Sequence, residues 1–147
     1  MSIRFYRPEG EWGYLSNFAP HPISLHGKTW ATNEHYFQAQ KFAGTEHEDR
    51  VRRAVTPKEA AGIGRDPELP LRGDWETVKD GIMREACRAK FVQHPTLGAR
   101  LQSTGDEELI EASPTDNYWG AGADGLGKNT LGRILMDLRA ALLKERA

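Results

Sequence analysis

The stretch DWETVKDGIMREACRAKFVQHP, residues 74–95, decides the fold class because it predicts one long helix. Asp74 is a residue type that favours the N-cap, and Pro95 prevents the helix from continuing beyond about Gln93. Apolar side chains recur between them at the helical spacing of three and four, at Trp75, Val78, Ile82 and Ala86. A helix of this length in one chain of 147 residues favours a mainly α protein.

Further helices are predicted on both sides of this stretch. Asn33 is expected to cap a helix to about residue 43, and a short helix is expected at 46–55. Thr56 and Glu59 form a capping-box pattern around Pro57, for a helix that ends by Gly62 or Gly64. A turn or two of helix is expected at 96–102, and the last helix is expected to begin at Asn129.

Short strands complete the predicted fold. Residues 23–25 and 29–30 form a hairpin pattern around His26 and Gly27, and residues 108–112 read as one more strand. The segments 65–73 and 116–128 are expected to be loops. About five helices against two or three short strands predict a mainly α (α+β) fold, in a single domain over residues 1–147.

Composition excludes several classes of function. The 20 basic and 21 acidic residues give a net charge of −1, which argues against a surface that coats nucleic acid but leaves room for a local anion site. No apolar run is long enough to span a bilayer, and no signal peptide is visible, so we expect no membrane association. The one cysteine, Cys87, suits the reducing cytoplasm and is interpreted as a buried thiol.

Residues 116–129 are the most unusual segment, because they hold four of the 15 glycines and end where a helix begins. Glycine-rich backbone and a helix N-terminus attract phosphate, Lys128 adds a full positive charge, and Tyr118 and Trp119 can stack on a base. A P-loop is rejected because Asn129 replaces the hydroxyl that would bind magnesium. The alternative interpretation is a flexible loop before an amphipathic helix.

A second candidate is a helix face that carries Glu34, Gln38 and Lys41 at spacings of four and three. On spacing alone, such a pattern is more often a solvated surface than a cleft. His35 is more often a packing residue than a ligand, and no two histidines have the spacing of metal ligands. We therefore expect no metal and no cofactor.

Several sequence motifs resemble those of the NADAR (YbiA-like) family. They are YLSNF at 14–18, GKTW at 27–30, EHYFQAQKF at 34–42, DNYWG at 116–120 and GLGKNTLG at 125–132. The blocks keep the family's order and span nearly the whole chain. The resemblance implies hydrolysis of an N-glycosidic bond in one of two substrate classes: ADP-ribose attached to guanine in nucleic acid, or phosphorylated ribosylamino-pyrimidine intermediates of riboflavin biosynthesis.

The resemblance also implies which residues function. Positions that match functional residues of the family are Glu34, Trp75 and Asp116, and a lysine that forms a Schiff base with the opened ribose falls on Lys41, with Lys128 as the competing position. The predicted catalytic set is therefore Glu34, Asp116 and Lys41. The predicted substrate contacts are Asn17, Phe18, Gln38, Trp75, Tyr118, Trp119, Gly120, Gly125, Gly127, Lys128 and Asn129.

The expected chemistry suits these residue types. Cleavage builds positive charge at the anomeric carbon, which a carboxylate stabilises, while an acid helps the base nitrogen to leave. A lysine in a partly desolvated site becomes a neutral nucleophile. The first hypothesis is removal of ADP-ribose from guanine, paired with a DNA-modifying ADP-ribosyltransferase as in toxin–antitoxin systems. Its rivals are the riboflavin-related activity and a non-catalytic module that binds ADP-ribose.

Overall fold

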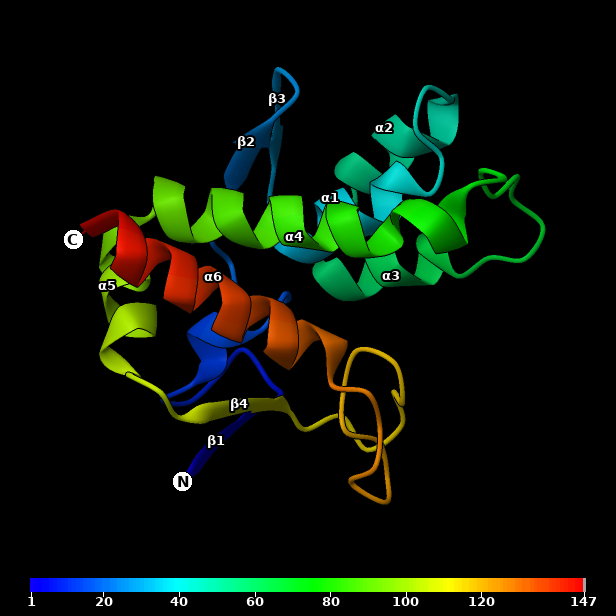
Figure 1. The fold of residues 1–147 in the computed structure, drawn as a ribbon. Coiled ribbons are helices and arrows are strands. Elements are labelled where there is room, and N and C mark those ends of the chain that lie inside the picture. Colours follow the sequence, from blue (N-terminus) through cyan, green and yellow to red (C-terminus); the bar gives the residue numbers. More distant parts are fainter. Residues whose placement is uncertain (147) are drawn as a thin grey trace. The chain divides into compact units, whose positions relative to one another are not determined.

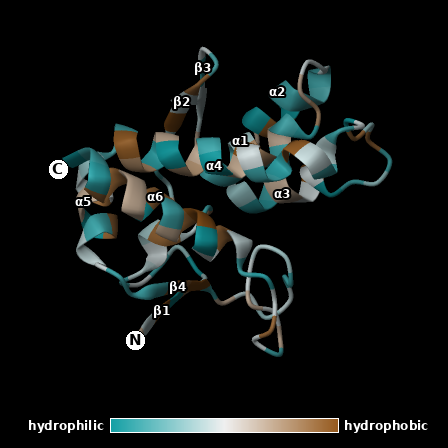
Figure 2. Cartoon of the chain, in the orientation of Figure 1, coloured by the Kyte–Doolittle hydropathy of each residue, from teal (hydrophilic) through white to brown (hydrophobic). Residues whose placement is uncertain are grey.

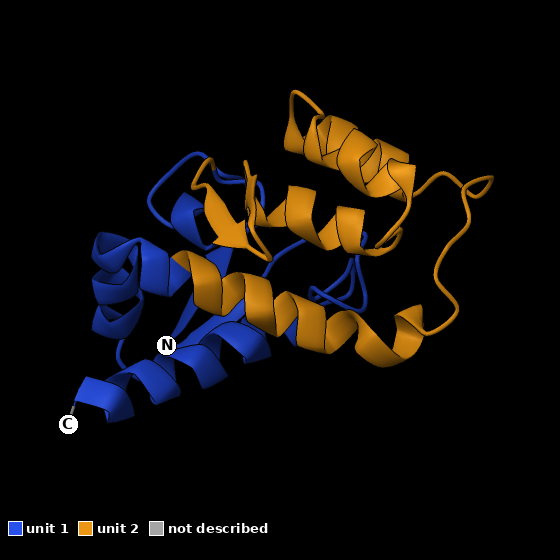
Figure 3. Ribbon diagram, turned by 90° about the horizontal axis from the view of Figure 1, so that it is seen from above, with its two compact units in different colours: residues 1–19, 91–147 blue, residues 20–90 orange. Residues whose placement is uncertain are grey.

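The computed structural model describes residues 1–146, which form six α-helices, four short strands and one turn of 3-10 helix (Figure 1). The mainly α (α+β) class is confirmed. The chain divides into two compact units, Met1–Ala19 with Phe91–Ala147 and Pro20–Lys90 (Figure 3). The expectation of a single domain stays a prediction. No helix within residues 1–146 is both long and apolar enough to cross a membrane.

The first unit joins the two ends of the chain through a parallel strand pair. Strand β1 (Ser2–Phe5) pairs with β4 (Glu108–Glu111), with Ile3 opposite Leu109. Helix α6 (Thr130–Arg146) packs against β4 (Figure 1). A Cβ on Gly132 would overlap the carbonyl oxygen of Leu109, so glycine is what lets α6 lie this close to the strand. The unit also contains η1 (Gly13–Leu15) and α5 (Pro95–Ser103).

Helix α6 follows the predicted amphipathic pattern, and Figure 2 shows hydrophobic and hydrophilic residues interleaved along it. Its buried apolar residues are Leu131, Ile134, Leu135, Leu138 and Leu142. Arg139 is buried as well, and it donates a hydrogen bond to Thr104 Oγ1 at 2.9 Å. The apolar stripe supplies the unit's helical core, because burial of such side chains is worth about 1.5–3 kcal/mol each.

The second unit begins with the predicted hairpin. Strands β2 (Ile23–Leu25) and β3 (Lys28–Trp30) are antiparallel, with Ile23 opposite Trp30. His26 and Gly27 both have positive φ angles, 55° and 76°, which is the backbone that a tight hairpin turn requires. Trp30 is completely buried, and its indole donates to the carbonyl of Leu25 at 3.2 Å, so its role is structural.

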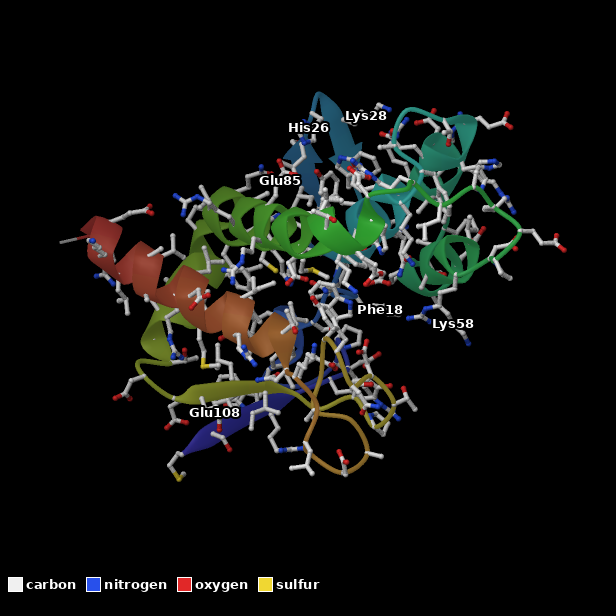
Figure 4. The ribbon with its side chains drawn as sticks, turned by 45° about the vertical axis from the view of Figure 1, so that its right-hand side comes forward. Phe18, His26, Lys28, Lys58, Glu85 and Glu108 are labelled. Atoms are coloured by element: carbon white, nitrogen blue, oxygen red, sulfur yellow. The ribbon has the colours of Figure 1, made fainter. Side chains whose placement is uncertain are left out.

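Three short helices and the long one follow the hairpin: α1 (Asn33–Gln40), α2 (Glu46–Arg52), α3 (Pro57–Gly64) and α4 (Trp75–Gln93). Tyr36 on α1 packs its ring edge against Trp30 and donates its hydroxyl proton to Glu85 on α4. Figure 4 shows His26 of the hairpin reaching toward the same Glu85, at 3.2 Å. These contacts fix α1 between the hairpin and α4.

Several helix ends differ from the predicted ones by one to three residues. Thr32, rather than Asn33, caps α1, because its hydroxyl accepts from the His35 amide at 3.1 Å. Helix α1 ends at Gln40 instead of 43, and α2 ends at Arg52 instead of 55. At α3 the predicted cap is confirmed, since Thr56 Oγ1 accepts from the Glu59 amide. Helix α6 begins one residue after Asn129, whose φ is 51°.

Candidate active site

The candidate residues of the second unit start on α1, which is buried from Asn33 to Ala39. Glu34 is 7% exposed and Gln38 is 3% exposed, so the solvated-surface interpretation of this face is wrong. Gln38 Nε2 donates to Glu34 Oε2 at 2.7 Å across one helical turn. A carboxylate is rarely buried without a partner, and this hydrogen bond supplies part of its compensation.

Lys41 follows α1 and lines a cavity of about 330 Å³ together with Gly64, Arg65 and Trp75. Its ammonium nitrogen donates to the carbonyl of Gly64 at 3.1 Å and lies 5.8 Å from the ring centroid of Trp75. Trp75 is 6% exposed and packs against Phe37 with ring centroids 5.0 Å apart. The volume falls within the range of small-molecule sites, about 300–1,000 Å³.

The surroundings of Lys41 in this cavity lower the pKa of its ammonium group. Burial lowers the pKa of Lys41 from its ordinary value, the Glu34 carboxylate opposes that change, and the charges of Arg65 and Lys79 lower the pKa further. Arg65 itself is exposed, and no hydrogen bond or ion pair joins its guanidinium to another residue of the described chain. By contrast, Arg72 is held by Asp74 at 2.7 Å. Arg65 is thus the cation at this cavity that can bind an anion without losing a partner.

Many amides of the glycine-rich loop of the first unit are paired within the loop, rather than open as the sequence suggests. Its amides are hydrogen-bonded to its own carbonyls: Gly127 to Ala121, Lys128 to Asn117, Asn129 to Gly120, Thr130 to Tyr118 and Leu131 to Trp119, at 2.7–3.0 Å. Gly125 donates to Gly122 at 3.3 Å. Carbonyls of Tyr118 and Trp119 therefore occupy the amides of Thr130 and Leu131, which begin α6 and which phosphate would need. The predicted backbone phosphate site loses these two donors and otherwise stays a prediction.

Asn129 has a structural role at this junction. Its Oδ1 accepts from the Glu111 amide and its Nδ2 donates to the Leu109 carbonyl, both at 2.9 Å. The side chain thus pairs with β4 as a neighbouring strand would. The prediction that Asn129 contacts substrate is not supported by these bonds, because both ends of its amide are engaged by the strand.

Asp116 is held rigidly at the start of this loop. Its Oδ1 accepts from the amides of Tyr118 at 2.9 Å and Trp119 at 2.8 Å, while its own amide donates to Ser113 Oγ. The rings of Tyr118 and Trp119 meet edge to face at 4.9 Å, and both side chains are half-buried. Lys128 is exposed, with its ammonium 5.4 Å from the Tyr118 ring centroid. The four residues therefore form one polar and aromatic cluster.

Glu111 is a candidate that sequence reasoning missed. It is 9% exposed, and its carboxylate lies against Gly120, where a Cβ would overlap Oε2. Burial, and after it the nearby Asp116 charge, raise the pKa of Glu111 to about 7, against the opposing effect of a hydrogen bond from the Ser113 amide. A carboxyl group that exchanges its proton near neutral pH has the property of a general acid. The signal that could have identified Glu111 is its spacing from the apolar Leu109. Residues two apart on a strand point to the same face, and on β4 that face is buried.

The remaining candidates are less informative. Phe18 and Asn17 follow η1 in the first unit and are half-buried, and the Phe18 amide donates to Ser16 Oγ at 3.1 Å (Figure 4). His35 is fully buried and bonded through both ring nitrogens, to Thr32 Oγ1 and the Ala54 carbonyl, which confirms its packing role. Cys87 is buried, which confirms its interpretation as a buried thiol, and burial raises its pKa to about 12. Within residues 1–146 no group of three His, Cys, Asp or Glu side chains is placed to hold a metal ion.

The structure brings some candidates together and leaves others apart. Glu34, Gln38, Lys41 and Trp75 belong to the second unit and are linked there by direct contacts or by charge. The remaining candidates, Asn17 and Phe18 with those of the 116–129 loop, belong to the first unit. Each group is a partial site in its own unit.

Comparison with known proteins supports one assignment. Residues 4–143 match the NADAR domain, so the match runs through both units. The N-glycosidase YbiA of Escherichia coli is 49% identical over 144 residues, which cover 98% of this chain and 90% of that protein. An N-glycosidase of Nostoc punctiforme is 47% identical, covering 95% of this chain and 91% of that one.

A more distant relative and a solved structure support the same family. A riboflavin biosynthesis protein of Vibrio vulnificus is 42% identical over 95% of this chain, although the match covers only 38% of that protein. The NMR structure of E. coli YbiA superimposes with a TM-score of 0.91 at 48% identity, covering 99% of this chain and 89% of that one. The chain therefore belongs to the NADAR family, the family of these N-glycosidases.

Proposed function

We propose that this chain hydrolyses the bond between ribose and the nitrogen of a heteroaromatic base, and that its substrate is ADP-ribose attached to guanine. The observation that carries the proposal is the buried Glu34–Gln38 pair beside a cavity that holds Lys41 and Trp75. A module that only bound ADP-ribose would need stacking and phosphate contacts. It would not need a desolvated lysine next to a buried carboxylate.

The lysine route proceeds by two exchanges at the anomeric carbon, C1. When ribose is attached to an amino nitrogen, its ring opens to an imine at C1. Neutral Lys41 Nζ then adds to C1, and the bond from C1 to the base nitrogen breaks, with a proton passing to the departing amine. Water hydrolyses the lysine imine, which returns the free amine and leaves ribose with a C1 aldehyde that recloses. Lowering the pKa of Lys41 by burial increases the fraction of neutral amine that starts this sequence.

Glu34 has a role in this route and in direct hydrolysis. It carries the proton between Lys41 and the leaving nitrogen in the first, and it stabilises the positive charge at C1 in the second. Asp116 is assigned to position water or a ribose hydroxyl, since its Oδ1 is fixed by two amides. Trp75 and Trp119 are the candidate stacking surfaces. Lys41 is preferred to Lys128 as the nucleophile because Lys128 is exposed.

The phosphate of either substrate is assigned to side chains. The candidate cation in the second unit is the guanidinium of Arg65 at the cavity, and the candidate in the first unit is the exposed ammonium of Lys128. Arginine binds phosphate well because its planar fork donates two parallel hydrogen bonds. A net charge of −1 for the whole chain suits such a local site.

A second substrate, a phosphorylated ribosylamino-pyrimidine, is favoured by one specific observation. Relatives named riboflavin biosynthesis proteins, from V. vulnificus and maize, are each 42% identical to this chain. Both candidate substrates place ribose C1 on a base nitrogen, so the same residues serve either one. If guanine is the substrate, the reaction reverses that of an ADP-ribosyltransferase, and we propose such an enzyme as the functional partner in the cytoplasm.

The deciding experiment supplies the purified protein with both substrates and measures the products by chromatography: free ADP-ribose with the unmodified strand from one, and the free amino-pyrimidine from the other. We expect release of ADP-ribose from ADP-ribosylated oligonucleotide at a higher kcat/KM than release of the pyrimidine. The Glu34→Gln variant keeps the shape of the side chain and serves as the inactive control. The opposite preference assigns the riboflavin-related substrate. Binding of ADP-ribose with release from neither substrate would leave only the binding module.

A further inference from the structure

Gly64, the last residue of α3, touches two side chains of the candidate site, Lys41 and Gln38. Its carbonyl accepts a hydrogen bond from Lys41 Nζ at 3.1 Å. On its other side the amide of Gln38 lies where a side chain would be: a Cβ on Gly64 would overlap Oε1 and would come within 2.7 Å of Cδ and 2.9 Å of the Gln38 Cβ. Gly64 is buried in the second unit.

Backbone conformation does not explain why this residue is glycine. Gly64 is helical, without the positive φ that favours glycine, and glycine in a helix is less stable than alanine. Gly62, two residues earlier in the same helix, has no heavy atom within 4 Å of its ideal Cβ. The contact with Gln38 is therefore what requires the missing side chain at position 64.

That contact fixes the orientation of the Gln38 amide. Nε2 donates to Glu34 Oε2 at 2.7 Å, which turns Oε1 toward Gly64. Oε1 is buried and has no hydrogen-bond partner among the described residues. If the amide were reversed, its oxygen would face the Glu34 carboxylate and repel it. Gln38 thus gives up one hydrogen bond in order to hold Glu34, and a small neighbour at position 64 makes this arrangement possible.

The other side of Gly64 holds the amine. A backbone carbonyl is a neutral acceptor, so it positions Nζ without the charge by which a carboxylate would stabilise the ammonium form. One residue thereby sets the place of both Lys41 and, through Gln38, Glu34. This combination suits a reaction in which the amine must be held in place and yet lose its proton.

We propose that Gly64 is a positioning residue for the N-glycosidase reaction, an inference that rests on the proposed roles of Lys41 and Glu34. A methyl group at position 64 forces either the Gln38 amide or the end of α3 to move. If the amide moves, it releases the Glu34 carboxylate, which then stabilises the Lys41 ammonium. If α3 moves, it withdraws the carbonyl and admits water around Nζ. Both movements disfavour the neutral amine.

The test compares Gly64→Ala with Gly62→Ala, each in the full chain. It repeats Gly64→Ala in a Gln38→Ala background, where the overlaps with Oε1 and Cδ are removed and only the 2.9 Å approach to the Gln38 Cβ remains. One readout is the pH dependence of acetylation of Lys41 by trace acetic anhydride, followed by mass spectrometry of its peptide. The other readout is the kcat for cleavage of the bond between ribose C1 and the base nitrogen. The first readout needs no substrate, so it still tests Gly64 if the proposed reaction is not observed.

We expect Gly64→Ala to move the midpoint of Lys41 acetylation toward the 10.5 of an ordinary lysine and to lower kcat at least tenfold. Gly62→Ala is expected to match the wild type in both readouts. In the Gln38→Ala background, Gly64→Ala is expected to change each readout less than twofold. An unchanged midpoint in Gly64→Ala, or an equal effect in both backgrounds, would overturn the proposal. If Gly64→Ala fails to fold, folding of the double variant supports the contact, and its failure refutes it.

Discussion

The titration of Glu111 provides a quantitative test of the first unit. Its pKa is raised from 4.5 to about 7, chiefly by burial and then by the charge of Asp116. Each pH unit of difference between the folded and unfolded chain corresponds to about 1.4 kcal/mol, so the complete effect is about 3 kcal/mol. Because the folded pKa is the higher one, the folded protein retains this proton between pH 4.5 and 7. The associated stability is therefore present below pH 4.5 and is lost as the pH rises through 7.

The Glu111→Gln variant removes this titration and keeps the size of the side chain. We expect the free energy of unfolding of the wild type to fall relative to that of Glu111→Gln by about 3 kcal/mol between pH 4 and pH 8.5. Urea unfolding at half-unit pH steps measures the difference, and groups common to both proteins cancel. Glu108→Gln is the matched control, because Glu108 is exposed on the same strand (Figure 4). It should follow the wild type at every pH. A constant offset between wild type and Glu111→Gln over this range would refute the burial argument.

Three other predictions concern individual side chains. Lys41→Met should abolish the covalent adduct that borohydride traps with substrate, and a persisting adduct, located by peptide mapping, would move the role to Lys128. Arg65→Gln should raise KM about tenfold or more with little change in kcat, through loss of a charge-assisted hydrogen bond worth about 1.5–3 kcal/mol; Lys58→Gln, the same charge change on α3, should leave KM unchanged. Asn129→Ala should lower the free energy of unfolding by about 3 kcal/mol in urea, since it removes two bonds to β4 and puts alanine at a φ of 51°; a loss below 1 kcal/mol would contradict its structural role.

Local signals predicted the helices well. The long helix at 75–93 and the capping pattern at Thr56 depend on neighbours within one turn, which the sequence displays directly. The error at α1 was between adjacent residues, Thr32 and Asn33, which are both good N-caps. The choice between them depends on where the chain leaves β3, and that is set by the register of the hairpin.

The sequence did not show which strands pair when they lie far apart along the chain. The parallel partner of β1 lies more than 100 residues away, and alternation of apolar residues does not identify which strand pairs with which. For the same reason the glycines of the 116–129 loop suggested open amides. The bonds that occupy them come from carbonyls of residues 117–121, and a residue pattern does not show which donors and acceptors will meet.

At the candidate site, the polarity of a side chain was a poor guide to its exposure. On spacing alone, Glu34 and Gln38 are typical of a solvated face, because charged and amide side chains are usually exposed. In the structure each satisfies part of the other's hydrogen bonding in the interior. Glu111 was missed because a single acid at the end of a short strand carries no motif. The significance of Glu111 comes from its burial beside Asp116, and that burial depends on the fold.

The pairing of β1 with β4 has a consequence for biosynthesis. Residues 20–90 are one continuous segment, and all their contacts within that unit become available before synthesis is complete. Strand β1 is translated before β4 and has no β4 to pair with until the ribosome has translated residues 108–111. During that interval it is an unpaired strand edge, the kind of surface that nascent chains use to associate with one another. The order of translation therefore delays the closure of the first unit until the last third of the chain has been made.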